Sequence, residues 1–319
     1  MNSGRRNFIS SASKAAMTMA ILPIACTVQS EDKEKKANAN QGFDISLAQW
    51  SIRDMIRSGK ISNLEFPETA KNMFDIHAVE YVSSFFDGKE TDQSYLKELK
   101  QRGDDLNVKN VLIMVDMWGP EGVLASPVEA ERRQAASNHH KWVDAAAFLG
   151  CHAIRVNASG YGDSSYQDAR DYFADGLSRL VEYGARNNIS IIVENHGGYS
   201  SNGNWLAEVM KKVDHVHCGT LPDFGNFQID KEAGIFYDPL KGLSQLMHYA
   251  KGVSAKSNDF DMHGYETTID YPAMMAIVKR FGFNGYVGIE FGGGSLTPAE
   301  EGIKKTKTLL EKLRKEYYG

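Results

Sequence analysis

Three features of the sequence predict an α/β protein that folds as a single-domain (β/α)8 barrel. From residue 43 onward, short apolar runs rich in β-branched residues alternate with amphipathic helical stretches, which is the pattern of βαβ units around a parallel sheet. Eight such units span about 275 residues, close to the roughly 250 residues of a (β/α)8 barrel. Runs such as residues 111–115 are apolar throughout, as expected of strands buried on both faces.

The predicted elements alternate along the chain. Strands are expected at residues 44–50, 77–82, 110–116, 153–157, 189–194, 215–221, 252–256 and 285–290. Helices are expected at residues 66–74, 93–103, 128–149, 164–187, 204–212, 239–248, 271–281 and 298–316. A doubly wound open sheet is the competing architecture, and it would place a G-x-G-x-x-G turn after the first strand. Residues 49–54 read QWSIRD instead, so we expect no nucleotide cofactor.

Composition narrows the class of protein. The chain has 319 residues, of which 42% are hydrophobic and 24% charged, values typical of a soluble globular protein with a sizeable core. Its three cysteines are too few for a disulfide scaffold or a cysteine-based zinc finger. The formal net charge of −5 disfavours a nucleic-acid partner, because phosphate binding needs a basic face.

The first 26 residues have the features of an export signal. A basic start with Arg5-Arg6-Asn7-Phe8-Ile9 precedes a short apolar run, which is the signal-peptide pattern. The paired arginines resemble the twin-arginine signal; an ordinary signal peptide is the alternative. Ala25-Cys26 resembles the end of a lipoprotein signal, with plain cleavage nearby as the alternative.

The expected organisation therefore has three parts: a signal peptide at residues 1–26, a disordered polar tether at residues 27–42, and the barrel at residues 43–319. We expect the protein in the periplasm, or anchored to a bacterial envelope membrane through a lipidated Cys26. No other segment is apolar and long enough to span a membrane.

Chemistry in such a barrel lies at the carboxyl ends of the strands. The polar and aromatic residues at these predicted ends are Gln49, Trp50, Glu80, Asp116, Trp118, Arg155, Asn157, Glu194, His196, Asp223, Asn226, Lys256, Glu290 and Phe291. Glu194, Asp223 and Glu290 each follow an apolar run. Three carboxylates at one mouth repel one another unless a cation neutralises them. Taken singly, each acid could instead be a helix N-cap or a solvated loop residue.

The order of these motifs resembles the xylose isomerase-like barrel superfamily, and in particular proteins described as sugar phosphate isomerase/epimerase. The resemblance covers residues 44–316, and the matching segments are AQWS at 48–51, ENHGG at 194–198, DFGNF at 223–227 and GIE at 288–290. In the ketose epimerases of that group a Glu, an Asp, a His and a second Glu hold a divalent metal ion, and the two glutamates move the proton. The resemblance implies that Glu194, Asp223 and Glu290 are metal ligands and that Asn226 binds substrate. Oxygen ligands favour Mn²⁺ or Mg²⁺, with Co²⁺ or Zn²⁺ as alternatives.

The chain departs from this pattern on the seventh strand. Residues 251–256 read KGVSAK, so that Ser254 stands where the family usually has its histidine ligand. Three arrangements remain open. The metal ion is bound by the three carboxylates, His196 and water; or Asp259, Asp261 or His263 substitutes for the missing ligand; or the charge of Lys256 replaces the ion. A buried lysine beside carboxylates can act as an electrophile or a base.

These residues predict an exported sugar isomerase or epimerase that forms an enediolate by metal-assisted proton abstraction. We expect a non-phosphorylated keto- or aldo-sugar, because sugar phosphates are cytoplasmic. Glu194, Glu290 and Lys256 are the predicted catalytic residues. The predicted substrate-binding residues are Gln49, Trp50, Trp118, Arg155, Asn157, His196, Asn226 and Phe291.

Three other functions compete with this prediction. A lyase or hydratase acting on 3-keto-glycosides or a related oxidised sugar would use the same enediolate. A non-catalytic sugar-binding lipoprotein would keep the aromatic residues without needing Glu194 and Glu290. A DNA-repair endonuclease of this fold would need a cluster of histidines holding zinc and a basic face, and the acidic chain offers neither.

Overall fold

The computed structural model describes residues 42–294 and 296–319. The predicted signal peptide, Cys26 and nearly all of the predicted tether lie outside these residues. In the part of the chain that is described, no helix is both long enough and apolar enough to cross a membrane.

Eight parallel strands form the central sheet, in the order β6-β5-β4-β3-β2-β1-β10-β9. Their bounds are β1 Asp44–Ala48, β2 Ala78–Val82, β3 Lys109–Met114, β4 Ala153–Val156, β5 Ser190–Glu194, β6 Cys218–Leu221, β9 Val253–Ser257 and β10 Tyr286–Phe291. The two end strands, β6 and β9, meet through parallel bridges that join Thr220 to Ala250 and Asp223 to Ser254. The amide of Ser254 donates to the carbonyl of Pro222 at 2.8 Å across the same seam. These contacts bring the sheet close to a closed barrel, which confirms the predicted (β/α)8 fold.

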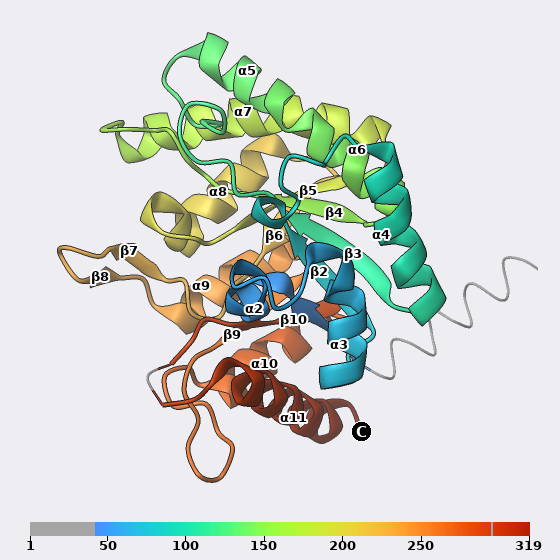
Figure 1. Cartoon of the computed structure of the whole chain (residues 1–319). Helices are drawn as coiled ribbons and strands as arrows, with labels where there is room; N and C mark the ends of the chain where they lie inside the picture. Colours follow the sequence, from blue (N-terminus) through green and yellow to red (C-terminus); the bar gives the residue numbers. More distant parts are fainter. Residues whose placement is uncertain (1–41, 295) are drawn as a thin grey trace, which may run out of the picture. The chain divides into compact units, whose positions relative to one another are not determined.

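Helices cover the outside of the sheet (Figure 1). Their bounds are α2 Arg53–Arg57, α3 Phe66–Phe74, α4 Gln93–Leu106, α5 Glu129–Asn138, α6 His140–Leu149, α7 Tyr166–Arg186, α8 Gly203–Val213, α9 Pro239–Leu246, α10 Tyr271–Arg280 and α11 Ala299–Tyr318. The single helix predicted at 128–149 is two helices that meet at His139. A short hairpin of β7 Gln228–Asp230 and β8 Ile235–Phe236 follows β6 and was not predicted.

Side-chain caps explain where several helices begin. Asp92 accepts hydrogen bonds from the amides of Ser94 and Tyr95 and so starts α4. Ser165 starts α7 in the same way, and Asn202 starts α8. Each cap satisfies amides that have no partner within the helix.

The apolar side chains of the strands form two layers, one between the sheet and the helices and one inside the barrel. On β10, Val287, Ile289 and Phe291 belong to the core between sheet and helices, whereas Gly288 and Glu290 face the barrel interior because successive side chains point to opposite faces. The interior carries its own smaller cluster, which includes Leu112 of β3 and Ile192 of β5. Polar side chains that share this inner parity therefore gather at the barrel mouth.

Candidate active site

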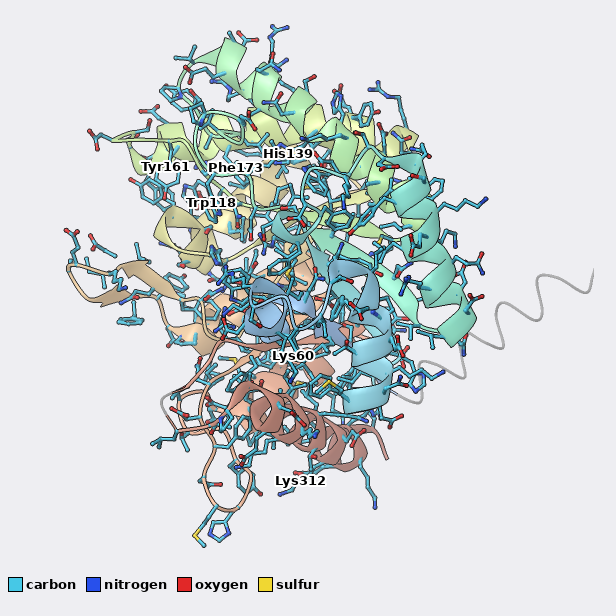
Figure 2. The ribbon with its side chains drawn as sticks, viewed as in Figure 1. Lys60, Trp118, His139, Tyr161, Phe173 and Lys312 are labelled. Atoms are coloured by element: carbon cyan, nitrogen blue, oxygen red, sulfur yellow. The ribbon has the colours of Figure 1, made fainter. Side chains whose placement is uncertain are left out.

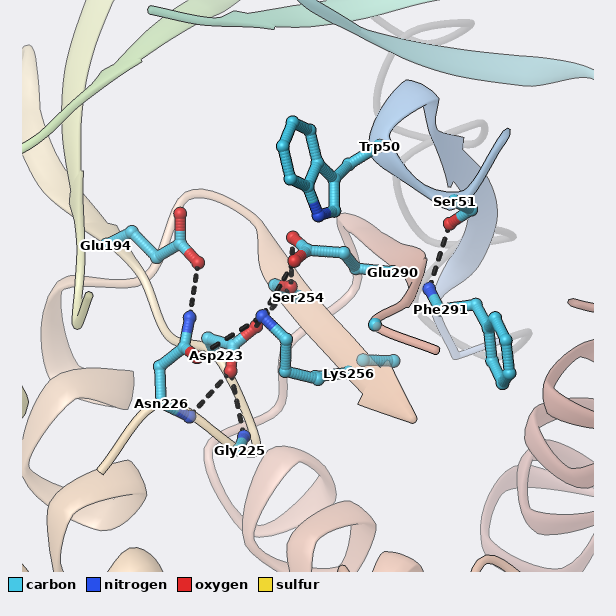
Figure 3. A network of polar contacts seen from close by, with 12 residues as sticks. Trp50, Ser51, Glu194, Asp223, Gly225, Asn226, Ser254, Lys256, Glu290 and Phe291 are labelled. Atoms are coloured by element: carbon cyan, nitrogen blue, oxygen red, sulfur yellow. Dashed lines mark hydrogen bonds and ion pairs between the residues drawn. The ribbon is translucent and has the colours of Figure 1, made fainter. Parts of the chain in front are cut away.

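Four charged side chains gather at the carboxyl ends of neighbouring strands. Glu194 ends β5, Asp223 follows β6, Lys256 lies on β9 and Glu290 lies on β10. All three carboxylates are buried, and the side chain of Lys256 is 16% exposed. Figure 3 shows the four groups converging from different strands. The structure therefore brings together the acids and the lysine that the sequence predicted for one site.

The three carboxylates form a compact triad. One oxygen each from Glu194, Asp223 and Glu290 lies within 4.8 Å of the other two. Burial raises the pKa of Glu194 to about 8 and also raises the pKa of Asp223. Burial alone would raise the pKa of Glu290 too, but the charge and hydrogen bond of Lys256 bring it below its ordinary value. The two glutamates therefore differ in how readily they give up a proton.

Lys256 contacts two of these acids directly. Its Nζ donates to Glu290 Oε1 at 2.7 Å and to Asn226 Oδ1 at 3.2 Å, and it lies 3.7 Å from Asp223 Oδ2. Burial opposes the charged form of Lys256, but Asp223 and the two glutamates outweigh that effect and raise its pKa. Lys256 is therefore a positive charge fixed among the carboxylates.

A second cation, Arg155 of β4, holds the other side of the site. Its Nε lies 2.9 Å from Glu194 Oε2, and its Nη1 donates to Asp116 Oδ1 at 2.6 Å. Asn157 Nδ2 also donates to Asp116 Oδ1, at 2.9 Å. Burial opposes ionisation of Asp116, yet Arg155 brings the pKa of Asp116 below its ordinary value. Asn226 Nδ2 donates to Glu194 Oε1 at 2.9 Å, which joins the two cationic sides of the site.

The triad could bind a divalent metal ion, and the neighbouring residues decide how well such an ion fits. The hydroxyl of Ser254 donates to Asp223 Oδ2 at 2.7 Å, and the other oxygen of Asp223 accepts the amides of Gly225 and Asn226 at 2.8 Å each. Both oxygens of Asp223 are thus engaged, and Lys256 holds Glu290. Because an ammonium and a metal ion repel each other, the residues as they lie do not fit a divalent ion together with Lys256.

The aromatic residues lie around the rim. Trp118, in the loop after β3 (Figure 2), is 57% exposed. Its ring centroid is 5.9 Å from that of His196. Trp50 lies over Glu290 at the mouth (Figure 3). The guanidinium groups of Arg53 and Arg57 lie 5.4 Å and 4.9 Å from the centroid of the Trp50 ring. Trp50, Trp118 and His196 are therefore placed where a ligand at the mouth would meet them.

Two of the predicted substrate-binding residues, Phe291 and Gln49, do not line the mouth, so these two predictions are wrong. Phe291 is buried on the outer face of β10, where it packs against Gly302 of α11, because its neighbour Glu290 takes the inner face. Gln49 is buried, and both ends of its amide are bonded within the protein. Its Nε2 donates to Asn63 at 2.6 Å, and its Oε1 accepts the amide of Val82 at 2.9 Å. Gln49 therefore ties the segment after β1 to Asn63 and β2 through both ends of its amide.

Glu80 of β2, to which the sequence analysis assigned no role, lies buried inside the barrel. Its Oε1 accepts the hydroxyl of Ser46 at 2.6 Å, while its Oε2 has no hydrogen-bond partner among the described residues. Burial raises the pKa of Glu80 to about 7. The absence of a side chain at Gly288 makes room for this carboxyl group, since a Cβ there would come within 2.5 Å of it. An acid inside an otherwise apolar strand was the signal available in the sequence.

A (β/α)8 barrel with buried acids at the strand ends is the architecture of a barrel enzyme. The chain belongs to the xylose isomerase-like TIM barrel family, whose model matches residues 68–313. Among curated protein sequences, none matches the chain.

Solved structures share the fold at low sequence identity. The chain is similar to an L-ribulose 3-epimerase, with 12% identity, a TM-score of 0.68, and coverage of 86% of this chain and 95% of the other. It is similar to 3-keto-D-glucoside 4-epimerase from E. coli, with 16% identity, a TM-score of 0.63, and coverage of 85% and 99%. It is also similar to a probable 3-DHS dehydratase from Bacillus anthracis, with 16% identity, a TM-score of 0.61, and coverage of 84% and 99%.

Proposed function

We propose that the protein is a sugar isomerase or epimerase that moves the proton on a carbon beside a carbonyl group. The observation that carries this proposal is the pair Glu194 and Glu290, two buried carboxylates at one mouth whose pKa values are shifted in opposite directions. Such a pair supplies a base and an acid at the same pH. The family and its sugar epimerase neighbours support the same class of reaction.

The reaction begins when the ionised carboxylate of Glu290 takes the proton from the C–H bond next to the carbonyl. The electron pair of that bond forms a carbon–carbon double bond, and the carbonyl oxygen becomes an enediolate oxygen. Glu194 then delivers a proton. Delivery to the opposite face of the same carbon restores the carbonyl and inverts that centre. Delivery to the former carbonyl carbon gives the isomer when the proton of the neighbouring hydroxyl moves to the enediolate oxygen, so that this hydroxyl becomes the new carbonyl. Each turnover leaves the two glutamates with exchanged protonation states.

The surrounding side chains orient the substrate. Asn226 lies between Glu194 and Lys256 and is placed to bind a hydroxyl beside either group. Trp50 and Trp118 offer apolar ring faces of the kind that pack against a sugar ring. The predicted export signal favours a sugar without a phosphate group, and the site offers Lys256 and Arg155 already paired with carboxylates, where a phosphate would meet like charge.

The enediolate also needs a positive charge beside its oxygen. A divalent ion such as the predicted Mn²⁺ or Mg²⁺, held by Glu194, Asp223 and Glu290, would supply that charge only after Lys256 had moved away. Lys256 already brings one positive charge to the same place.

A lyase or hydratase acting on a 3-keto-glycoside or a related oxidised sugar is the second candidate. It would use the same enediolate and expel a β-substituent in place of returning the proton. The raised pKa of Glu194 favours this candidate as well, because a protonated acid can donate to the departing oxygen.

The test is proton exchange in deuterated buffer with a panel of keto- and aldo-sugars. Mass spectrometry and NMR would detect deuterium incorporation and the product formed. We expect Glu290→Gln to reduce exchange by roughly 100-fold or more. Glu300→Gln, which changes an exposed acid on α11, serves as the matched control and should leave exchange unchanged. Sugar binding without exchange, equal in both variants, would refute the proposal in favour of a sugar-binding protein.

A further inference from the structure

We propose that the ammonium group of Lys256 is the resident cation of this site and polarises the substrate carbonyl in place of a divalent metal ion. The inference rests on the proposed function for its chemical step, but the absence of a metal requirement can be tested without any substrate. The substrate class it implies is a sugar whose carbonyl oxygen accepts a hydrogen bond from the lysine.

The contacts of Lys256 are those of a bound cation. Its Nζ lies 2.7 Å from Glu290 Oε1 and 3.7 Å from Asp223 Oδ2, so it neutralises two of the three acids of the triad. An ammonium group has three N–H bonds. Among the described residues, Glu290 and Asn226 accept two of them. One N–H is therefore left for a ligand oxygen at the mouth.

The chain builds a slot for the stem of this lysine. A Cβ at Gly225 would come within 3.0 Å of Lys256 Cδ, and a Cβ at Gly292 would lie 3.6 Å from Lys256 Cε. The missing side chain at Gly225 leaves room for the methylene groups of Lys256, and Gly292 after β10 lies within van der Waals reach of the same stem. A lysine held along its length delivers its charge to a fixed point.

Asp223 is occupied in a way that weakens it as a metal ligand. Its Oδ1 accepts two backbone amides, and its Oδ2 accepts the hydroxyl of Ser254 at 2.7 Å. The same hydroxyl lies 3.4 Å from Glu290 Oε2. Ser254 and Lys256 share the inner face of β9, so together they provide the hydrogen bonds and the positive charge that an ion would otherwise provide.

In the reaction, the carbonyl oxygen accepts the free N–H of Lys256. As Glu290 removes the neighbouring carbon-bound proton, the electron pair moves into the new double bond and negative charge develops on that oxygen. Lys256 stabilises this charge by hydrogen bonding and keeps its proton. The return of a proton to carbon restores the carbonyl, and no oxidant or reductant is needed.

The first experiment measures metal binding to the purified protein in the absence of sugar. After dialysis against MnCl2, elemental analysis should find well under one ion per chain. The thermal midpoint should differ by less than about 1 °C between EDTA and MnCl2, because a ligand stabilises only the state that binds it. About one bound ion per chain, or a rise of several degrees with MnCl2, would overturn the inference.

Two substitutions should convert the lysine site into a metal-binding site. Replacing Lys256 by Met removes the charge and keeps the length, and replacing Ser254 by His adds a good metal ligand. The double variant should bind about one Mn²⁺ per chain and melt several degrees higher with MnCl2 than with EDTA. Lys304→Met, which changes an exposed lysine on α11, is the control and should behave as wild type. Failure of the folded double variant to bind Mn²⁺ would count against the inference, and if that variant does not fold, the wild-type measurements decide.

A second experiment separates the inference from the proposed function. Deuterium exchange by wild type should persist in EDTA and fall roughly 100-fold in Lys256→Met. Exchange that is abolished by EDTA and restored by Mn²⁺ would keep the proposed function and refute the role of Lys256. No exchange with any sugar, either in EDTA or with added Mn²⁺, would refute the proposed function, while a protein that binds no metal ion would still support Lys256 as the resident cation.

Discussion

Replacing Arg155 should destabilise the protein strongly, because its guanidinium group is the positive neighbour of two acids, Glu194 and Asp116, inside the barrel. Its side chain is 5% exposed and contacts Glu194, which is 0% exposed, and Asp116, which is 17% exposed. Arg155→Met keeps the bulk of the side chain and removes the charge. Glu194 and Asp116 would then be left near Glu290 without their main positive neighbour.

The expected loss follows from the burial of these groups. Breaking a buried ion pair by removing one partner costs about 3–5 kcal/mol, because the remaining charge is desolvated and uncompensated. A domain of this size loses about 2 °C of thermal midpoint for each kcal/mol, so the midpoint should fall by about 6–10 °C. Arg170→Met is the matched control, since Arg170 pairs with Asp171 and Glu208 at the surface. It should cost no more than about 1 kcal/mol.

The assay is thermal and urea-induced unfolding of wild type, the two single variants and Arg155→Met combined with Asp116→Asn. The double variant should recover part of the loss, because Arg155 keeps Asp116 ionised and the neutral amide of Asn needs no counter-charge. An Arg155→Met protein as stable as Arg170→Met, or a double variant less stable than Arg155→Met alone, would refute the reasoning.

Three further predictions concern pH and packing. Proton exchange should persist at pH 5 and decline above about pH 8, because Lys256 lowers the pKa of Glu290 while burial raises that of Glu194 to about 8; a rate that climbs steadily to pH 10 would contradict this. Gly288→Ala should cost about 1–3 kcal/mol in urea unfolding, because its Cβ would come within 2.5 Å of the Glu80 carboxyl group, and Glu80→Ser should restore part of the loss. Burial lowers the pKa of His139 from 6.5 to about 4, so as the pH falls this histidine is protonated in the unfolded chain at a higher pH than in the folded protein. His139 should therefore contribute a loss of about 2 kcal/mol in the free energy of unfolding between pH 7 and pH 5, and His139→Asn should reduce the pH dependence by about that amount.

The barrel was predictable because the periodic pattern reflects burial. The helix Phe66–Phe74 matches its prediction, and the strands differ from theirs by a few residues at the ends. The break at His139 was not predictable, because residues on both sides of it favour a helix. The imidazole ring of His139 is buried there, and its Nδ1 hydrogen-bonds to the carbonyl of Ala135 at 2.7 Å. This contact joins residues four apart, the spacing of an uninterrupted helix, so the sequence pattern does not distinguish the break from a continuous helix.

The site was predictable where strand parity determines direction. Glu194, Lys256 and Glu290 each follow apolar residues at a strand end, so their common orientation could be inferred from alternation. The same alternation excludes Phe291, which follows Glu290 directly and must point the other way. Gln49 could not be excluded in this manner, because its role depends on Asn63, which lies 14 residues further along the chain in the short 3-10 helix Asn63–Glu65. The partners of Lys256 likewise become visible only once β9 and β10 lie side by side.

The way positive charge is distributed in this site has a consequence for specificity. A divalent ion places two charges at one point and binds a sugar by chelating two neighbouring oxygens. Here one charge on Lys256 faces Glu290 and Asp223, and another on Arg155 faces Glu194 and Asp116. A lysine needs a single acceptor oxygen, so the hydroxyl next to the carbonyl is not required for activation. A keto-sugar lacking that hydroxyl should therefore still exchange its proton, within about 10-fold of the parent sugar, since one hydrogen bond contributes about 1 kcal/mol. Complete loss of exchange with the deoxy sugar, while the parent sugar exchanges, would show that two oxygens must be chelated and that a metal ion performs the activation.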